Sequence, residues 1–354
     1  MQRVAIIGTT SWGITLGFML ARKGTEVRLW ARTEREAQKL KTKGPNQNQF
    51  PKLSFPPQIH INSHLSEAMN DANAVILAVP SPTMRQNIQL VASHLNKSVL
   101  IVSCAKGLEV GSGKRMSQVI AEEINPRFHA NICVCSGPNL AREVVRNLPA
   151  ATVAAASDNA TARKVQRLLT TPDFCVFTNS DVVGVELGGA LKNIIALGAG
   201  IADGLDYGDN AKAAFMTRGL TEITALGVAL GANPLTFSGL AGLGDVIATC
   251  ASPLSRNHYV GAELAKGEQT LTEIIDSMNE VAEGVGTTLV ARNIARQLEL
   301  EMPITEKLYQ VLYEDLPPKQ AAADLMGGVT RHELAGRKWR LFSLFQRQRR
   351  RSGS

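Results

Sequence analysis

Cysteine is scarce in this sequence, with five residues in 354. No two cysteines form a Cys-x-x-Cys pair, and their odd number does not indicate a disulfide framework. We therefore predict reduced, buried thiols and a cytoplasmic protein. The six histidines do not cluster with cysteines or carboxylates along the chain, so we expect no metal site.

Long hydrophobic runs are also lacking. The longest candidate, residues 194–202, contains two glycines and lies between Lys192-Asn193 and Asp203. A membrane span needs roughly 18 to 20 apolar residues, so we expect none here. The apolar residues that follow Arg3 are interrupted at Thr9, and no signal peptide is indicated.

Net charge is lacking outside the C-terminus. The formal net charge is +7, but seven Lys or Arg residues and no acidic residue lie between Arg337 and Ser354. The rest of the chain holds 31 basic and 31 acidic residues, which gives little reason to expect nucleic acid binding. The composition, 44% hydrophobic and 19% charged, is typical of a globular protein with about two domains.

The first half of the chain alternates short apolar segments, rich in β-branched residues, with helical patterns. Near-continuous apolar strands are typical of a parallel sheet covered on both faces, so we predict a doubly wound α/β domain of the Rossmann type. The expected strands are residues 3–7, 26–30, 74–79, 98–103, 131–135, 151–156 and 174–178. The expected helices include residues 12–23, 34–43 and 83–95.

Strand patterns stop near Asn179, and apolar residues then recur at helical spacing, as in residues 211–230 and 304–313. We therefore expect an all-α C-terminal domain after the sheet. The predicted division is a dinucleotide-binding domain over residues 1–180, a helical substrate and dimerisation domain over 181–336, and a basic tail over 337–354.

A glycine-rich turn joins the first strand to the first helix. The dinucleotide fingerprint needs Gly-x-Gly-x-x-Gly there, so that the helix N-terminus can meet a pyrophosphate. Gly8 and Gly13 hold the outer positions, and Thr10 holds the middle one. We expect the branched side chain of Thr10 to keep the cofactor farther off, unless its hydroxyl turns inward and donates to a phosphate oxygen.

The end of the second strand bears on the choice of cofactor. An acidic residue that binds the ribose 2′-hydroxyl belongs there, but Glu26 lies at the opposite end of that strand. Arg32 follows the far end, where an arginine can accept a 2′-phosphate or stack on adenine. The position favours NADP, or both cofactors, over strict NAD, and the alternative is an exposed arginine at the start of a helix.

Three loops follow predicted strands, at residues 79–81, 104–107 and 136–139. Ligands of open α/β sheets sit beyond the carboxyl ends of the strands, so we expect these loops to meet at one crevice. Lys106 follows an apolar strand directly, which favours a site residue over a surface lysine.

The helical half holds a second cluster. Lys192 lies in an apolar, glycine-rich helix, and a buried unpaired lysine needs a compensating role or a lowered pKa. The glycine-rich segment 239–245 ends in Asp245, and Ser255-Arg256-Asn257 offers groups that suit a phosphate. Each feature alone is an ordinary cap or turn, but together they predict an anion site beside a lysine.

Longer motifs carry a resemblance to the NAD(P)-dependent glycerol-3-phosphate dehydrogenases of the bacterial, soluble type. It covers nearly the whole chain, from Val4 to about Glu333. The motifs are Ala105-Lys106-Gly107-Leu108-Glu109, Ser136-Gly137-Pro138, Gly208-Asp209-Asn210-Ala211, residues 188–193, 239–245 and 255–257, Val281-Ala282-Glu283-Gly284 and Met302-Pro303-Ile304.

The resemblance implies that Lys192 is the proton acceptor and that Lys106 faces both cofactor and substrate. Together with the glycine turn, it gives the cofactor-binding residues as Gly8, Ser11, Trp12, Gly13, Arg32, Lys106, Ala141, Arg256, Val281 and Glu283. It gives the substrate-binding residues as Lys106, Gly137, Asn139, Lys192, Asp245, Ser255, Arg256 and Asn257. Two positions depart from the family, which has glycine at Thr10 and usually serine or threonine at Asn139.

The implied reaction is a reversible hydride transfer between NAD(P)H and dihydroxyacetone phosphate, giving sn-glycerol 3-phosphate for glycerophospholipid synthesis. The implied assembly is a homodimer. Two other functions stay open: a related two-domain reductase for another small hydroxy acid or alcohol, and a dinucleotide-sensing protein without turnover.

The tail permits a separate hypothesis. At about 100° per residue, one broad side of a helix would carry Trp339, Leu341, Phe342, Leu344 and Phe345, and the other would carry Arg340, Arg347, Arg350 and Arg351. Such a helix can make weak contact with an anionic membrane surface. The simpler interpretation is an unstructured tail, or one packed on a dimer partner.

Overall fold

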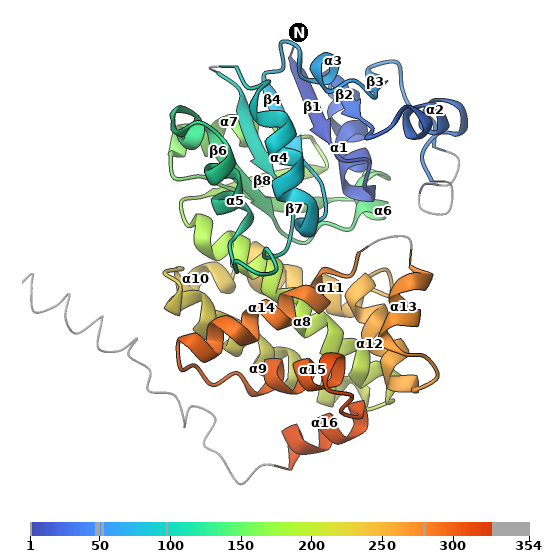
Figure 1. Ribbon diagram of the computed structural model, residues 1–354, viewed down its shortest axis with the longest axis vertical. Coiled ribbons are helices and arrows are strands. Elements are labelled where there is room, and N and C mark those ends of the chain that lie inside the picture. The colour runs from blue at the N-terminus through green and yellow to red at the C-terminus, as the bar shows by residue number, and fades with distance from the viewer. Residues whose placement is uncertain (1, 47–49, 51–52, 97, 279–280, 328–354) are drawn as a thin grey trace, which may run out of the picture.

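A computed structural model describes residues 2–46, 50, 53–96, 98–278 and 281–327, which form a sheet domain followed by a helical part (Figure 1). The strands are β1 (Arg3–Ile7), β2 (Glu26–Trp30), β3 (Ile59–Asn62), β4 (Ala74–Leu77), β5 (Leu100–Ser103), β6 (Ile132–Ser136), β7 (Ala150–Ala155) and β8 (Phe174–Asn179). They form one sheet in the order β3-β2-β1-β4-β5-β6-β7-β8.

The helices divide between the two parts of the chain. Those of the sheet domain are α1 (Ser11–Arg22), α2 (Glu34–Lys43), α3 (Leu65–Met69), η1 (Ser81–Thr83), α4 (Met84–Ala92), α5 (Met116–Glu123), η2 (Pro126–Asn131), α6 (Ala141–Val144) and α7 (Asn159–Leu169). Those that follow are α8 (Val182–Gly204), α9 (Gly208–Ala229), α10 (Pro234–Phe237), η3 (Leu240–Gly244), α11 (Asp245–Ala251), α12 (Arg256–Lys266), α13 (Leu271–Ser277), α14 (Glu283–Gln297), α15 (Pro303–Tyr313) and α16 (Pro318–Met326).

Both faces of the central strands are buried, as predicted. Val4 and Ile6 of β1 belong to one hydrophobic cluster, and Ala5 and Ile7 belong to another. Alternate residues of a strand point to opposite faces of its sheet, so each cluster covers one face. Strands β1 to β6 run parallel, which brings the loops after β1, β4, β5 and β6 to the same edge.

The far edge of the sheet differs from the prediction. Strand β7 pairs with β6 antiparallel, and β8 pairs with β7 parallel, so the last two strands run against the others. Along β8 buried Phe174 and Val176 alternate with exposed Cys175 and Phe177. Helix α7 packs on the face of β8 that carries Phe174 and Val176, and the opposite face is exposed. The prediction that every thiol is buried is therefore wrong for Cys175.

Strand β3 was not predicted. It has four residues, and only two of them, Ile59 and Ile61, are buried. A segment so short carries almost no periodic signal, and its pairing with β2 supplies the hydrogen bonds that make it a strand.

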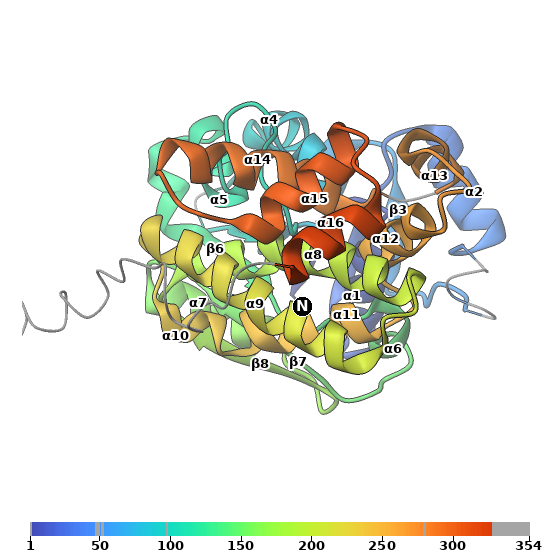
Figure 2. The ribbon, with the colours of Figure 1, turned by 90° about the horizontal axis from the view of Figure 1, so that it is seen from below.

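Helix α8 is the axis of the helical part. It packs against α9, α11, α12 and α14, and most of its residues are buried (Figure 2). Its apolar character satisfies the length and composition of a membrane span, as does Pro234–Ala251, but 83% of the α8 window is buried inside the protein. Core helices share this composition, and α8 is one of them.

Close backbone contact fixes α12 against α8. A Cβ at Gly200 would lie 2.0 Å from the His258 carbonyl oxygen, and one at Gly261 would lie 1.9 Å from that of Leu197. Only glycine permits this approach, which holds the first half of α12 against the C-terminal part of α8.

Candidate active site

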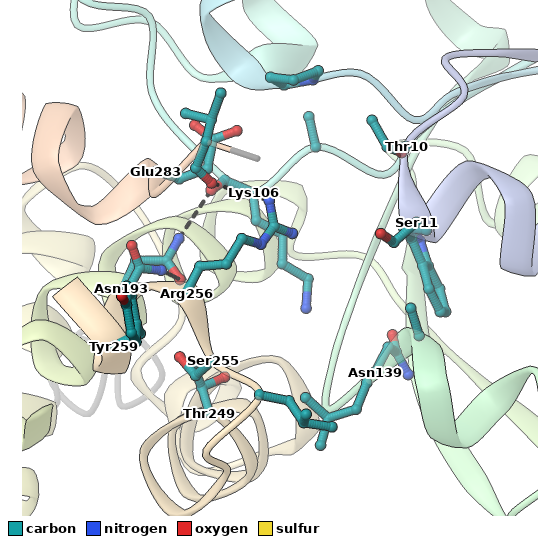
Figure 3. A pocket seen from close by; sticks show the side chains of 18 of the residues that line it. Thr10, Ser11, Lys106, Asn139, Asn193, Thr249, Ser255, Arg256, Tyr259 and Glu283 are labelled. Carbon is teal, nitrogen blue, oxygen red and sulfur yellow. Dashed lines mark hydrogen bonds between the residues drawn. The ribbon is translucent and has the colours of Figure 1, made fainter. Parts of the chain in front are cut away.

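A cavity of about 550 Å³ opens between the carboxyl edge of the sheet and the helical part (Figure 3). This volume is within the range of ordinary ligand sites. The sheet domain lines it with Thr10, Ser11, Trp12, Ala78, Val79, Pro80, Cys104, Ala105, Lys106 and residues 139–142. The helical part lines it with Lys192, Asn193, Thr249, residues 253–257, Tyr259, Ser277, Met278, Val281 and Glu283.

The glycine-rich turn lies at the start of α1. Gly8 has a φ of +114°, and a Cβ at Gly13 would lie 2.2 Å from the Gly8 carbonyl oxygen, so the turn folds too tightly for other residues. Thr10 caps α1: its Oγ1 accepts from the Gly13 N–H at 3.1 Å and donates to the Ala78 carbonyl at 2.7 Å. The hydroxyl proton therefore goes to the end of β4 and not to a phosphate.

This turn fits a dinucleotide. Ser11 and Trp12 line the cavity at the first turn of α1, where backbone N–H groups and the helix dipole attract a pyrophosphate. Gly8 and Gly13 shape the turn without lining the cavity. When bound, a nicotinamide cofactor supplies or accepts a hydride, and this chain positions it.

Two lysines that line the cavity share one buried carboxylate. Lys106 Nζ lies 2.6 Å from Asp245 Oδ2, and Lys192 Nζ lies 2.7 Å from Asp245 Oδ1. Asp245 is only 1% exposed and does not line the cavity, so it lies behind the two ammonium groups. Lys192 also donates to Thr249 Oγ1, and Lys106 donates to the Gly137 carbonyl at 2.7 Å.

Burial changes the proton affinity of this cluster. Desolvation, helped by the positive charge of Lys106, lowers the pKa of Lys192 to about 8, although Asp245 acts in the opposite direction. Burial alone would raise the pKa of Asp245, but Lys106 and Lys192 hold it below its usual value. Lys192 thus exchanges a proton near neutrality, while Asp245 stays charged.

A chain of hydrogen bonds through two side-chain amides supports the segment that carries Lys106. Asn193 donates through Nδ2 to the Lys106 carbonyl at 3.1 Å and accepts from Asn257 Nδ2 at 2.9 Å. Asn257 Oδ1 in turn accepts from the Gly284 N–H at 2.9 Å. These hydrogen bonds connect the loop after β5 to α8, α12 and α14 and so hold the backbone of Lys106 in place.

The first turn of α12 faces the same cavity. Ser255 caps this helix by accepting from the His258 N–H at 3.3 Å. The N–H groups of a first turn lack partners within the helix, so this end attracts an anion. Arg256 extends into the cavity (Figure 3). Its guanidinium donates to the Val281 carbonyl at 3.0 Å. A guanidinium at a helix N-terminus suits a phosphate.

Glu283 joins the two parts of the protein across the cavity. Its carboxylate accepts from the Ser81 N–H at 2.8 Å and from the Ser81 hydroxyl. Burial raises the pKa of Glu283, although the bonds from Ser81 oppose this. The contact holds the loop after β4 against the start of α14.

Asn139 engages its amide with the sheet: Nδ2 donates to the Ala151 carbonyl at 3.0 Å. The second N–H of the amide and the carbonyl oxygen of the side chain are left for a ligand. Asn139 can therefore both donate and accept, as the serine or threonine usual in the family can, but through two atoms instead of one hydroxyl.

Most predicted site residues come together in this cavity. Those that line it are Ser11, Trp12, Lys106, Asn139, Ala141, Lys192, Ser255, Arg256, Asn257, Val281 and Glu283. Gly8, Gly13, Gly137 and Asp245 support lining residues from behind, and Arg32 is exposed outside the cavity at the end of β2. Their individual roles stay predictions.

Sequence reasoning missed Thr249, Asn193 as a hydrogen-bonding partner, and the pairing of Ser81 with Glu283. The only sequence signal for Thr249 is its spacing of four residues from Asp245 on α11, which places both on one helix face. In the part of the chain that the structure describes, no three His, Cys, Asp or Glu side chains form a group that could hold a metal ion.

Comparisons with known proteins agree with this architecture. Residues 3–162 match the model of the NAD-dependent glycerol-3-phosphate dehydrogenase N-terminus, and residues 181–323 match that of its C-terminus. An NAD(P)+ glycerol-3-phosphate dehydrogenase of Dehalococcoides mccartyi strain 195 is 59% identical over 352 residues, 99% of this chain and 98% of the relative. One from Enterococcus faecalis strain V583 is 48% identical over 335 residues, 94% of this chain and 98% of the relative.

A solved structure shows the same fold. The glycerol-3-phosphate dehydrogenase of Coxiella burnetii is 34% identical, with a TM-score of 0.86 over 92% of this chain and 99% of its own. Its match spans both the sheet domain and the helices that close the cavity. The chain therefore belongs to the NAD-dependent glycerol-3-phosphate dehydrogenase family, whose members are NAD(P)-dependent oxidoreductases.

Proposed function

We propose that this chain interconverts dihydroxyacetone phosphate and sn-glycerol 3-phosphate with NAD(P). The observation that carries the proposal is Lys192, a lysine that is 6% exposed, lines the cavity and has its pKa lowered to about 8 by burial. Family membership supplies the reaction, and this lysine supplies the proton transfer that the reaction needs.

Lys192 works in both directions. As a neutral amine it takes the proton of the C2 hydroxyl while the alcohol is oxidised, and as an ammonium it returns the proton to the ketone oxygen. Asp245 keeps the ammonium form accessible near neutrality, since without it burial would favour the amine alone. Lys106 lies 2.6 Å from the same carboxylate and lines the same cavity, and we assign to it the stabilisation of the developing alkoxide by its positive charge.

The phosphate of the substrate is assigned to the first turn of α12, with Ser255, Arg256 and Asn257. Support comes from the helix N-terminus and from the guanidinium that extends over it. Binding energy from this non-reacting group helps to hold C2 near Lys192, which is how remote contacts accelerate a reaction. Gly137 and Asn139 complete the substrate side.

The cofactor is assigned to the turn after β1 and to the α14 side of the cavity. Gly8, Ser11, Trp12 and Gly13 would hold the pyrophosphate, and Arg32 the adenosine end. Ala141, Arg256, Val281 and Glu283 would lie along the rest of the molecule. The support for this assignment is that these groups lie along or beside one cavity, with Arg32 beyond its end.

A single assay tests the proposal. NADH oxidation is followed with dihydroxyacetone phosphate and, separately, with a panel of unphosphorylated keto acids. Turnover only with the phosphorylated ketone is expected, because the α12 site recognises an anion distinct from the reacting carbon. Faster turnover with a keto acid would favour the related reductase, and dinucleotide binding without turnover would favour a sensor.

The remaining expectations concern context. A homodimer and a role in glycerophospholipid synthesis rest on the family resemblance, and a cytoplasmic location rests on the few cysteines, which form no Cys-x-x-Cys pair. The division at residues 180 and 181 is supported by the start of α8 at Val182 and by the family model that begins at residue 181. The tail over 337–354, with its proposed contact with anionic membranes, lies outside the described residues.

A further inference from the structure

The adenosine end of the cofactor site has an acidic group that the sequence did not place there. Glu26 begins β2 and pairs with Arg3 and Arg28, so it is unavailable to a ligand. Arg32, after the far end of β2, is exposed. A carboxylate reaches this end of the strand from elsewhere, namely from Glu36 in the first turn of α2.

Glu36 bridges the two segments that flank an adenosine ribose in doubly wound folds. One oxygen, Oε1, accepts from the hydroxyl of Thr9, the residue after Gly8 in the glycine-rich turn. The other, Oε2, accepts from the backbone N–H of Arg32 at 3.0 Å. The carboxylate therefore lies between the turn after β1 and the end of β2, where the ribose 2′-hydroxyl binds in this fold.

This arrangement is more than helix capping. Thr33 caps α2 by accepting from the Glu36 N–H at 3.1 Å, and in a capping box the Glu36 side chain would bond back to the Thr33 N–H. Here it reaches past the cap to Arg32 and Thr9 instead. The side chain is only partly buried, so its remaining acceptor positions are open to a ligand.

We propose that Glu36 is a specificity-determining residue that favours NAD over NADP. Its carboxylate accepts a hydrogen bond from the ribose 2′-hydroxyl and repels a 2′-phosphate. Arg32, whose backbone N–H donates to Glu36, carries the opposite charge and favours a 2′-phosphate, so the two residues together set the ratio of the affinities for NADH and NADPH. The proposal rests on the dinucleotide site of the proposed function.

The test is the dissociation constant of the full-length protein for NADH and for NADPH, measured by calorimetric titration without substrate. Glu36→Gln removes the charge. Its Oε1 can still accept from the Arg32 N–H, and its Nε2 can donate to the hydroxyl oxygen of Thr9. The affinity for NADPH relative to that for NADH should rise by about tenfold. This is the effect of removing one negative charge close to the 2′-phosphate in a partly exposed site. A higher salt concentration screens the charge of Glu36, so the wild type and this variant should then differ less in the ratio of the two dissociation constants.

Glu34→Gln is the matched control. It removes the same charge from the same helical turn, but Glu34 accepts from Ser63 and does not reach the glycine-rich turn. The ratio should stay that of the wild type in this variant. A merely structural role for Glu36 would weaken both dinucleotides equally and leave the ratio unchanged, which would overturn the proposal. Failure of the wild type to bind either dinucleotide would instead refute the proposed function.

Discussion

Replacing Asp245 with Asn tests whether the buried carboxylate sets the proton affinity of Lys192. The carboxylate lies 2.7 Å from Lys192 Nζ and favours its ammonium form, whereas burial and Lys106 favour the amine, with a resulting pKa of about 8. Two unit charges about 4 Å apart interact by about 4 kcal/mol in a partly polar interior. Each pH unit corresponds to about 1.4 kcal/mol, so the variant should titrate about 2 to 3 pH units lower.

The assay is the pH dependence of glycerol 3-phosphate oxidation at saturating substrate. In the wild type the rate should rise with pH through about 8, because only the amine of Lys192 accepts a proton, and the reverse rate should fall over the same interval. In Asp245→Asn the midpoint should move to lower pH while the amide preserves the shape of the site. Thermal unfolding at each pH confirms that the measured protein is folded.

Asp203→Asn is the control for this experiment. Asp203 is on the same helix as Lys192 and pairs with Lys212 and His258, without contact to either active-site lysine. Its loss should leave the midpoint near that of the wild type. A midpoint for Asp245→Asn that stays in place, or moves to higher pH, would refute the argument that Asp245 stabilises the ammonium form.

Four further predictions follow from the same cavity and from the tail. Lys192→Ala should bind cofactor nearly as the wild type does and lose at least about 100-fold in turnover, and retention of a tenth of the turnover would remove Lys192 as the base. Arg256→Ala should raise the KM for dihydroxyacetone phosphate by far more than that for dihydroxyacetone, because loss of the charged partner of a phosphate in a desolvated site costs about 2–5 kcal/mol. Equal increases in the two KM values would show that the phosphate binds elsewhere. Thr10→Gly should lower the free energy of unfolding by about 1 kcal/mol, because the hydrogen bonds to Ala78 and Gly13 are lost. It should also tighten NADH binding several-fold in a calorimetric titration, because the branched side chain no longer keeps the cofactor at a distance. Weaker binding would contradict this steric argument. A chain ending at Gly336 should sediment less with anionic vesicles than the full chain, and equal sedimentation would end the membrane hypothesis.

The local sequence pattern was sufficient to predict much of the secondary structure of this protein. The apolar run of β1, the turn from Gly8 to Gly13 and the helix after it are encoded within 22 consecutive residues and form as predicted. The same holds for the sheet buried on both faces and for the helical second half, because strand and helix periodicities are properties of neighbouring residues. The loops after β4, β5 and β6 also met at one edge, since parallel strands leave no other arrangement.

The direction of β7 and the existence of β3 depended on tertiary pairing. Strand β3 has only four residues, and the hydrogen-bond partners of both β3 and β7 are other strands whose positions no local pattern specifies. The exposure of Cys175 also depends on tertiary packing, because the packing of α7 decides which face of β8 is covered.

By itself, the sequence determined that Lys106, Lys192 and Asp245 are candidates for one site, through the residue types and the motifs around them. Only the tertiary structure decided that Asp245 lies between the two lysines and that Thr249 completes the cluster. Lys106 and Asp245 are 139 residues apart in the chain, and Lys192 and Thr249 are 57 apart. The physical reason is that a lysine's proton affinity depends on the charges within a few ångströms and on the water excluded around it, and packing of distant segments sets both.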